Sequence, residues 1–376
     1  MLGVWTFVMP AADVRVNVMF SVLEASRSVE GNIVCYASLV SALSAATGTS
    51  GSPDTIRVYK DIPLSSVVSI PAGKHIELTS SIGNSIWTLK RGATTTGDLF
   101  TVASGASLTL STLIIDGDKN TVADAGGSLV KNSGIFTMND GATLQNNKTT
   151  TSGDSGGGVY NSGAFDMDGG AISGNSADGG GGVYNSGTFT MNDGTISENE
   201  ASMFGGGVYN DGTGTFTMND GSITGNSADD GGGVSNAGNF RMYNGSITKN
   251  EASSMYGGGV YNSGTGTFTM NDGTISENKV TGTTSGQGGG VYISDGTFDM
   301  NRGTISKNEV TATNGQGGGV HIAAGTFTMN GGTIYGTNAV ADANIANTGV
   351  AISVNSGTAQ YGNFSTISTS DNTITP

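Results

Sequence analysis

The stretch GGGVYNSGTFTMNDGTISEN, residues 180–199, decides the fold, because close copies of it recur along the chain. Within each copy a phenylalanine is followed two residues later by methionine and seven residues later by isoleucine, and these spacings never vary. A glycine triplet opens each of the seven copies, at Gly156, Gly180, Gly205, Gly231, Gly257, Gly288 and Gly317. Self-similarity at such a period is the signature of a repeat architecture.

Each copy contains three short stretches, V-Y-N, F-x-M and x-I-x, in which inward and outward positions alternate as they do in a β-strand. Glycine-containing turns separate them. Such a unit cannot bury a core alone and must stack on its neighbours. The glycine triplets and the lack of an apolar period of 3.6 exclude helical repeats, and three strands do not fill a propeller blade. We therefore predict an all-β fold, a single-stranded parallel β-helix of about 12 coils, right-handed by the general crossover preference.

Four regions follow from the pattern. Residues 1–52 are an N-terminal segment with a capping helix expected at Tyr36–Ala46, where Leu39, Val40 and Leu43 share a face. Residues 53–130 alternate without the motif and are predicted to form irregular early coils. Residues 131–347 are the regular repeats, and 348–376 a decayed last coil with a C-terminal tail.

The repeated residues divide into an inward and an outward set. Phenylalanine, methionine, isoleucine and valine are predicted to face inward. The third residue of V-Y-N is also predicted to face inward, because Ile293 and Ile322 replace its asparagine in the last two copies. Stacked asparagine amides then form an interior ladder from Asn161, Asn185, Asn210, Asn236 and Asn262. A second series is predicted to stack at a turn, at Asn175, Asn199, Asn226, Asn250, Asn278, Asn308 and Asn338.

The middle residue of V-Y-N is predicted to face outward as an exposed aromatic column. Its members are Tyr160, Tyr184, Tyr209, Ser235, Tyr261, Tyr292 and His321. Cross-coil stacking alone explains such a column, and a platform for sugar rings or a protein partner is the functional alternative. The loop before each glycine triplet varies most in length, which often marks a binding edge. Two of these loops carry the apolar pairs Met203-Phe204 and Met255-Tyr256, which either pack over the coil or contact a partner.

Composition limits the partners. Thirty acidic residues against 15 basic ones leave no basic patch for nucleic acid. The single Cys35 makes neither an intramolecular disulfide nor, alone, a metal site, and no stretch is long and apolar enough for membrane insertion. Leu2–Ala12 is apolar but lacks a preceding basic region, so no clear export signal is expected there. We expect no cofactor, no bound metal and a monomer.

Many parallel β-helices act on polysaccharides, which requires converging carboxylates or a calcium-binding acidic cluster with a base. The acidic residues here recur with the repeat, as turn formers do, and the pair Asp229-Asp230 has no basic neighbour in its loop. Arg241 with Tyr243 is the nearest approach to a unique polar cluster. No catalytic residues are therefore expected, and a polysaccharide lyase or glycoside hydrolase is the alternative. Outward ranks of Thr and Ser also resemble the faces of solenoid antifreeze proteins, which keeps ice binding as a further alternative.

The segment from Ile172 to Val183, ISGNSADGGGGV, resembles the paired F-x-x-N and G-G-A-I repeats of polymorphic outer-membrane-type and adhesin-like surface proteins. The resemblance covers residues 126–340, with Ile in place of Phe and GGGV in place of GGAI. It implies an exported, extracellular or cell-surface β-helix that presents a surface to glycans or host proteins. Without a translocating barrel or wall anchor, a fragment or passenger domain is expected. The sequence therefore predicts a non-enzymatic adhesin-like protein.

Overall fold

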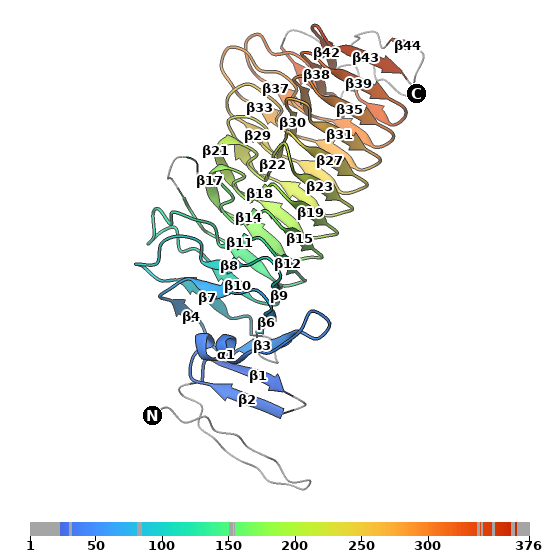
Figure 1. Ribbon diagram of the computed structural model, residues 1–376. Helices are drawn as coiled ribbons and strands as arrows, with labels where there is room; N and C mark the ends of the chain where they lie inside the picture. The colour runs from blue at the N-terminus through green and yellow to red at the C-terminus, as the bar shows by residue number, and fades with distance from the viewer. Residues whose placement is uncertain are drawn as a thin grey trace.

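The computed structural model is a right-handed parallel β-helix in which successive coils stack into a rod (Figure 1). It describes residues 23–29, 32–80, 85–149, 153, 155–336, 339, 341–347, 350–361 and 365–366. The fold class is as predicted. The rod has about ten turns, not twelve, because several coils carry insertions and the two ends do not form complete coils. Leu2–Ala12 lies outside the described residues.

Four sheets run along the rod, and we name each after its recurring residue. The Phe sheet comprises, in spatial order, β2 (Asn32–Tyr36), β1 (Ala25–Val29), β3 (Asp54–Val58), β6 (His75–Ser80), β9 (Ser107–Ser111), β12 (Ile135–Met138), β15 (Ala164–Met167), β19 (Thr188–Met191), β23 (Thr215–Met218), β27 (Asn239–Met242), β31 (Thr267–Met270), β35 (Thr297–Met300), β39 (Thr326–Met329), β43 (Thr358–Tyr361) and β44 (Ser365–Thr366). The Ile sheet comprises β4 (Ile62–Leu64), β7 (Thr88–Arg91), β10 (Ile114–Asp116), β13 (Thr143–Gln145), β16 (Ala171–Ser173), β20 (Thr195–Ser197), β24 (Ser222–Thr224), β28 (Ser246–Thr248), β32 (Thr274–Ser276), β36 (Thr304–Ser306) and β40 (Thr333–Ile334).

The other two sheets flank the variable loops. The Tyr sheet comprises β5 (Val68–Ile70), β8 (Phe100–Val102), β11 (Val130–Asn132), β14 (Val159–Asn161), β18 (Val183–Asn185), β22 (Val208–Asn210), β26 (Val234–Asn236), β30 (Val260–Asn262), β34 (Val291–Ile293), β38 (Val320–Ile322) and β42 (Ile352–Val354). The loop sheet comprises β17 (Ser176–Gly179), β21 (Glu200–Phe204), β25 (Ser227–Ala228), β29 (Glu251–Ala252), β33 (Lys279–Val280), β37 (Glu309–Val310) and β41 (Ile345–Ala346).

The loop sheet was not predicted, since most of its strands are only two residues long. A signal for it does exist in the sequence: a small apolar residue lies two positions after each asparagine of the second series. Those that the structure describes, from Ala177 to Val310, are buried, and Ala252, Val280 and Val310 form a satellite core with Ala312 and Ala346. The chain therefore makes four strands per coil over most of the regular repeats.

Identical residues stack on one another because parallel strands pair in register, coil on coil. The phenylalanine rings from Phe136 to Phe327 are fully buried, with neighbouring centroids 4.5 to 5.0 Å apart. Each stacked aromatic pair contributes about 1 kcal/mol beyond the burial of its apolar area. The predicted inward set of Phe, Met, Ile and Val is confirmed.

Both asparagine series are buried ladders. In the first, each Nδ2 donates to the Oδ1 of the next coil at 2.7 to 2.8 Å, from Asn132 to Asn262. In the second, the corresponding distances from Asn175 onward are 2.9 to 3.1 Å. Asn338, predicted as the last member, lies outside the described residues, and Asn344 accepts from Asn308 instead.

An antiparallel hairpin, β1 and β2, extends the Phe sheet at the N-terminal end, and helix α1 (Leu39–Ala45) contacts both of its strands and β3. The helix starts later than predicted, because Tyr36 ends β2 and Ser38 is the N-cap. Val40, expected on the buried face, is 56% exposed, and Ala42 is buried in its place. Among the described residues, no helix has the length and apolar character needed to cross a membrane.

Candidate functional site

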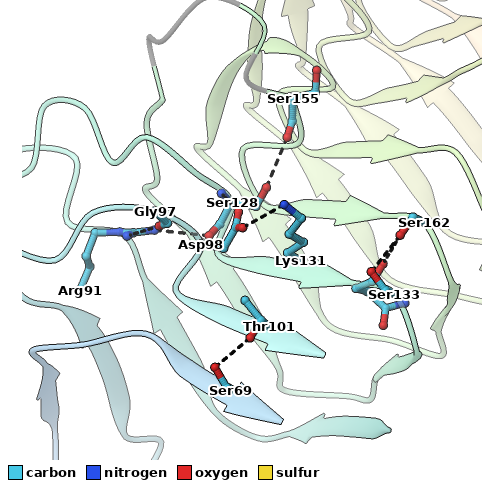
Figure 2. Close-up of polar contacts among 11 residues, drawn as sticks. Ser69, Arg91, Gly97, Asp98, Thr101, Ser128, Lys131, Ser133, Ser155 and Ser162 are labelled. Atoms are coloured by element: carbon cyan, nitrogen blue, oxygen red, sulfur yellow. Dashed lines mark hydrogen bonds and ion pairs between the residues drawn. The ribbon is translucent and has the colours of Figure 1, made fainter. Parts of the chain in front are cut away.

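The middle residues of the Tyr sheet strands form one column along the rod, which we call the tyrosine column. Its register continues beyond the seven predicted members at both ends, to Ser69, Thr101 and Lys131 before Tyr160 and to Ser353 after His321. Figure 2 shows the N-terminal part, where Thr101 Oγ1 donates to Ser69 Oγ at 3.1 Å.

The column is less exposed than predicted. Tyr160, Tyr184, Tyr209 and Tyr261 are half-buried. The prediction of exposure was wrong for three members, since Ser235 is 1%, Tyr292 6% and His321 0% exposed. Tyr256, from the loop before Gly257, stacks on Tyr292, and Tyr292 stacks on His321. A residue that points away from the core of a coil is therefore not exposed if a loop of the same rod folds over it.

The covering loops supply a second series of stacked residues beside the column. Parallel bridges join Ser155 to Gly179, Phe204 to Asp230, and Tyr256 to Gln287 and Gln316 in turn, and β17 and β21 pair Gly179 with Phe204. The ring centroid of Phe204 lies 5.9 Å from that of Tyr209 and 6.4 Å from that of Tyr261.

Tyr256 lies in the equivalent place two coils further on. Its ring centroid is 5.8 Å from that of Tyr261 and 4.3 Å from that of Tyr292, on which it stacks. Both aromatic loop residues thus pack against their own rod, whereas their neighbours Met203 and Met255 are 43% and 39% exposed. The column and these loop residues together make one strip of rings, which we call the aromatic strip.

The rings of the strip are not equivalent. Tyr160 and Tyr184 stack face to face at 4.8 Å, and Tyr292 stacks on His321 at 5.4 Å. Tyr209 meets Tyr184 edge-on, at an interplanar angle of 75°, and Tyr261 is tilted by 53° against Tyr292. The face-to-face order therefore breaks on both sides of Ser235, the coil that contributes no ring.

Polar contacts hold the strip in place. Tyr184 Oη donates to Asp211 Oδ2 at 2.7 Å. Burial and this hydrogen bond raise the pKa of Tyr184. Burial alone would also raise the pKa of Asp211, but the hydrogen bonds from Tyr184 and Thr213 outweigh it, so the pKa of Asp211 is lowered. Asp230 Oδ1 accepts from the backbone N–H groups of Met255 and Tyr256 at 3.3 and 2.9 Å, and burial raises its pKa. Asp230 thus fixes the loop that carries Tyr256.

A charged residue, Lys131, precedes the first tyrosine of the column on its N-terminal side (Figure 2). Lys131 Nζ lies 5.5 Å from the centroid of the Tyr160 ring and 3.4 Å from Asp98 Oδ2. Asp98 also accepts from Ser128 N at 3.0 Å. Nearby, the buried Arg91 donates to three backbone carbonyls, including Gly97 O at 2.8 Å, and burial lowers its pKa to about 10.

At the other end, His321 is fully buried and neither ring nitrogen has a hydrogen-bond partner in the described structure. Burial lowers the pKa of His321 to about 4, so the ring is neutral at pH 7. This histidine was predicted as an exposed member of a binding edge, and in the structure it is buried in the outward column, with Tyr292 stacked on its ring.

The remaining candidates lie apart from one another. Arg241 and Tyr243 are exposed on and just after β27 of the Phe sheet, away from the aromatic strip. Asp229 Oδ1 accepts from Ser253 Oγ at 3.0 Å, a loop contact like that of Asp230. In the part of the chain that the structure describes, no group of three or more His, Cys, Asp or Glu side chains could hold a metal ion.

The outward hydroxyls of the Ile sheet form a regular rank over five coils, from Thr195 to Ser306. Neighbouring hydroxyls bond along it, with Ser246 Oγ 3.3 Å from Ser222 Oγ and Thr248 Oγ1 3.2 Å from Thr224 Oγ1. The rank is only partly open to solvent, since Ser276 and Ser306 are buried.

A hollow of about 350 Å³ lies between two successive variable loops. It is lined by Ser253, Ser254, Met255, Gly282, Thr283, Thr284 and Ser285. The hollow adds hydroxyl groups and the exposed Met255 to the edge on which the aromatic strip lies.

The sequence and the structure were compared with protein-family models, curated proteins and solved structures. No protein-family model matches this chain, and no curated protein or solved structure matches it either. Any function must therefore be argued from the geometry.

Proposed function

We propose that this chain is a non-enzymatic, adhesin-like β-helix that binds glycans along the aromatic strip. The observation that carries the proposal is the strip itself. Half-buried rings continue from Tyr160 to Tyr261 on one edge of a rigid rod, with the exposed Met203 and Met255 beside them. Aromatic side chains with a few hydroxyl groups beside them are typical of binding surfaces.

The rod supplies rigidity and the loops supply variation. Buried phenylalanine and asparagine ladders hold each coil in register, so the strip is positioned before a ligand arrives. Insertions fall mainly in the loops beside it. Several weak contacts along one extended polymer would then add up through avidity. A cell-surface or extracellular setting follows from this proposal and from the resemblance to adhesin-like repeats.

The test is binding of the purified protein to immobilised neutral and acidic polysaccharides and to host glycans. Serine occurs naturally in the column at position 235, so Tyr160→Ser, Tyr184→Ser and Tyr209→Ser combined should leave the backbone folded. We expect this triple variant to lose at least ten-fold in affinity, whereas the matched control Thr269→Ser on the Phe sheet should bind as the wild type does.

Three outcomes would contradict the proposal. They are no binding of the wild type to any glycan, new reducing or unsaturated sugar ends in the incubation, or thermal hysteresis that Thr195→Tyr abolishes. The second outcome would favour a polysaccharide-active enzyme and the third an ice-binding protein.

A further inference from the structure

The coil of Ser235 is the one place in the regular part of the tyrosine column where no ring occupies the outward position. Ser235 pairs in register with Tyr209 on one side and with Tyr261 on the other. The Phe204 ring is within 6.4 Å of both of these tyrosine rings, which places it between them, at the level of the serine coil. Ser235, although small and outward-pointing, is 1% exposed, which agrees with a ring lying on top of it.

We call Phe204, Tyr209 and Tyr261 around Ser235 the Phe204 cradle. A stacked tyrosine has its two faces covered by its neighbours and offers only its edge to a ligand. Phe204 differs, since it is tilted by 41° and 34° against the two tyrosines and stacks on neither. Phe204 is only half-buried, so part of its ring is open to solvent.

Tyr256 has the same place in its own loop and provides the contrast. Its coil neighbours include Tyr292, which contributes a ring where the Phe204 cradle has Ser235. Tyr256 stacks on that ring at 4.3 Å, at an interplanar angle of 26°. A loop ring therefore stacks on the column where a tyrosine occupies the next coil, and is tilted between two tyrosines where Ser235 takes that place.

Polar groups beside the cradle indicate the ligand class. Asp230 is bridged to Phe204, and its Oδ1 accepts two backbone N–H groups while its Oδ2 has no partner among the described residues. Residues 176–262 contain nine acidic and two basic side chains, so the field there is negative. A carboxylate oxygen accepts from a sugar hydroxyl but repels a uronate or a sialic acid.

We propose that the Phe204 cradle is a subsite for one neutral hexose ring of a polysaccharide. The C–H groups on one face of the sugar pack against the solvent-exposed part of the Phe204 ring, whose negative quadrupole attracts them. Asp230 Oδ2 accepts a hydroxyl at the rim of the same ring. This inference rests on the proposed glycan-binding function and assigns it a position and a ligand class.

The experiment compares four proteins by titration calorimetry against neutral glucan, galactan and mannan, with polygalacturonate and alginate as acidic probes. Phe204→Leu keeps an apolar cover over Ser235 but removes the flat ring, and we expect at least a ten-fold loss of affinity for the neutral polymer that the wild type binds. Ser235→Tyr restores the repeat residue and should displace Phe204, with the same loss. Tyr243→Leu, which removes an exposed ring outside the aromatic strip, is the matched control and should change affinity less than three-fold. Far-UV circular dichroism and the melting temperature confirm that each variant is folded.

The outcomes separate the two proposals. Wild-type binding that Phe204→Leu leaves unchanged would overturn the cradle while the glycan-binding function stands. Equal losses in Phe204→Leu and Tyr243→Leu would overturn its position, and binding of the acidic polymers alone would overturn its ligand class. Absence of all glycan binding by the wild type would refute the proposed function itself.

Discussion

A buried amide should cost most to remove in the middle of a ladder and least at its end, and the first asparagine ladder allows this to be measured. Asn210 lies in the middle, where it accepts from Asn185 Nδ2 at 2.7 Å and donates to Asn236 Oδ1 at 2.8 Å. Asn262 lies at the end, because Ile293 follows it in register. Isoleucine is therefore already accommodated at this position of the coil.

The magnitudes follow from the groups left unpaired. After Asn210→Ile, Asn236 Oδ1 loses its only donor among the described residues, and Asn185 Nδ2 keeps only carbonyl acceptors at 3.1 and 3.2 Å. After Asn262→Ile, no amide oxygen is orphaned, and Asn236 Nδ2 keeps its two carbonyl acceptors at 3.1 and 3.2 Å. Both substitutions also remove one donor from two backbone carbonyls. Since a buried polar group without a partner costs about 1–3 kcal/mol, we expect Asn210→Ile to destabilise by about 2 kcal/mol more than Asn262→Ile.

The assay is equilibrium unfolding in guanidinium chloride, followed by far-UV circular dichroism, with both variants measured at the same pH and salt concentration. The added burial of an isoleucine is common to the two variants and cancels in the difference. Equal costs for the two substitutions, or a greater cost at Asn262, would refute the idea that the ladder amides stabilise by pairing with one another.

Three further predictions concern backbone strain, acid stability and the aromatic core. Glu198→Gly should stabilise the protein by about 0.5–1 kcal/mol and so raise its melting temperature, because Glu198 has a φ of +55°. Gly174 and Gly225 occupy the same corner in the neighbouring coils. A lower melting temperature in scanning fluorimetry would contradict this. His321, with a folded pKa of about 4 against an ordinary 6.5, contributes stability that is complete above pH 6.5 and is lost as pH falls toward 4, by up to about 3 kcal/mol. His321→Phe should therefore flatten the dependence of urea unfolding on pH between 7 and 4, and an unchanged slope would exclude His321 as its source. Phe216→Ala should cost about 3–5 kcal/mol as a buried cavity in the middle of the ring stack, whereas Phe216→Leu should cost clearly less, and equal unfolding midpoints for the two variants would contradict that packing.

Much of the fold could be predicted because the same residue spacing recurs in seven copies of the repeat. Phe189 and Met191 are two residues apart, Ile196 follows at a constant distance, and each is buried as its pattern indicates. Isoleucine at positions 293 and 322 also correctly identified the asparagine positions as inward. Helix α1 was predicted with Leu39 and Leu43 correctly buried but with a start that is too early and Val40 wrongly on the buried face, since a single short helix offers no second copy against which to check its pattern.

By itself, the sequence determined the period, the inward set and the ladders, because a parallel coil places identical residues on one another and any period-two pattern then identifies one face. Only the tertiary structure decided what lies above the outward face. The burial of Tyr292 and His321, the position of Phe204 over Ser235 and the contact of Asp230 with the next loop all depend on where variable loops fold. Loop length is visible in a sequence, but the direction in which a loop folds depends on the shape of the neighbouring coils, which exist only once the rod has formed.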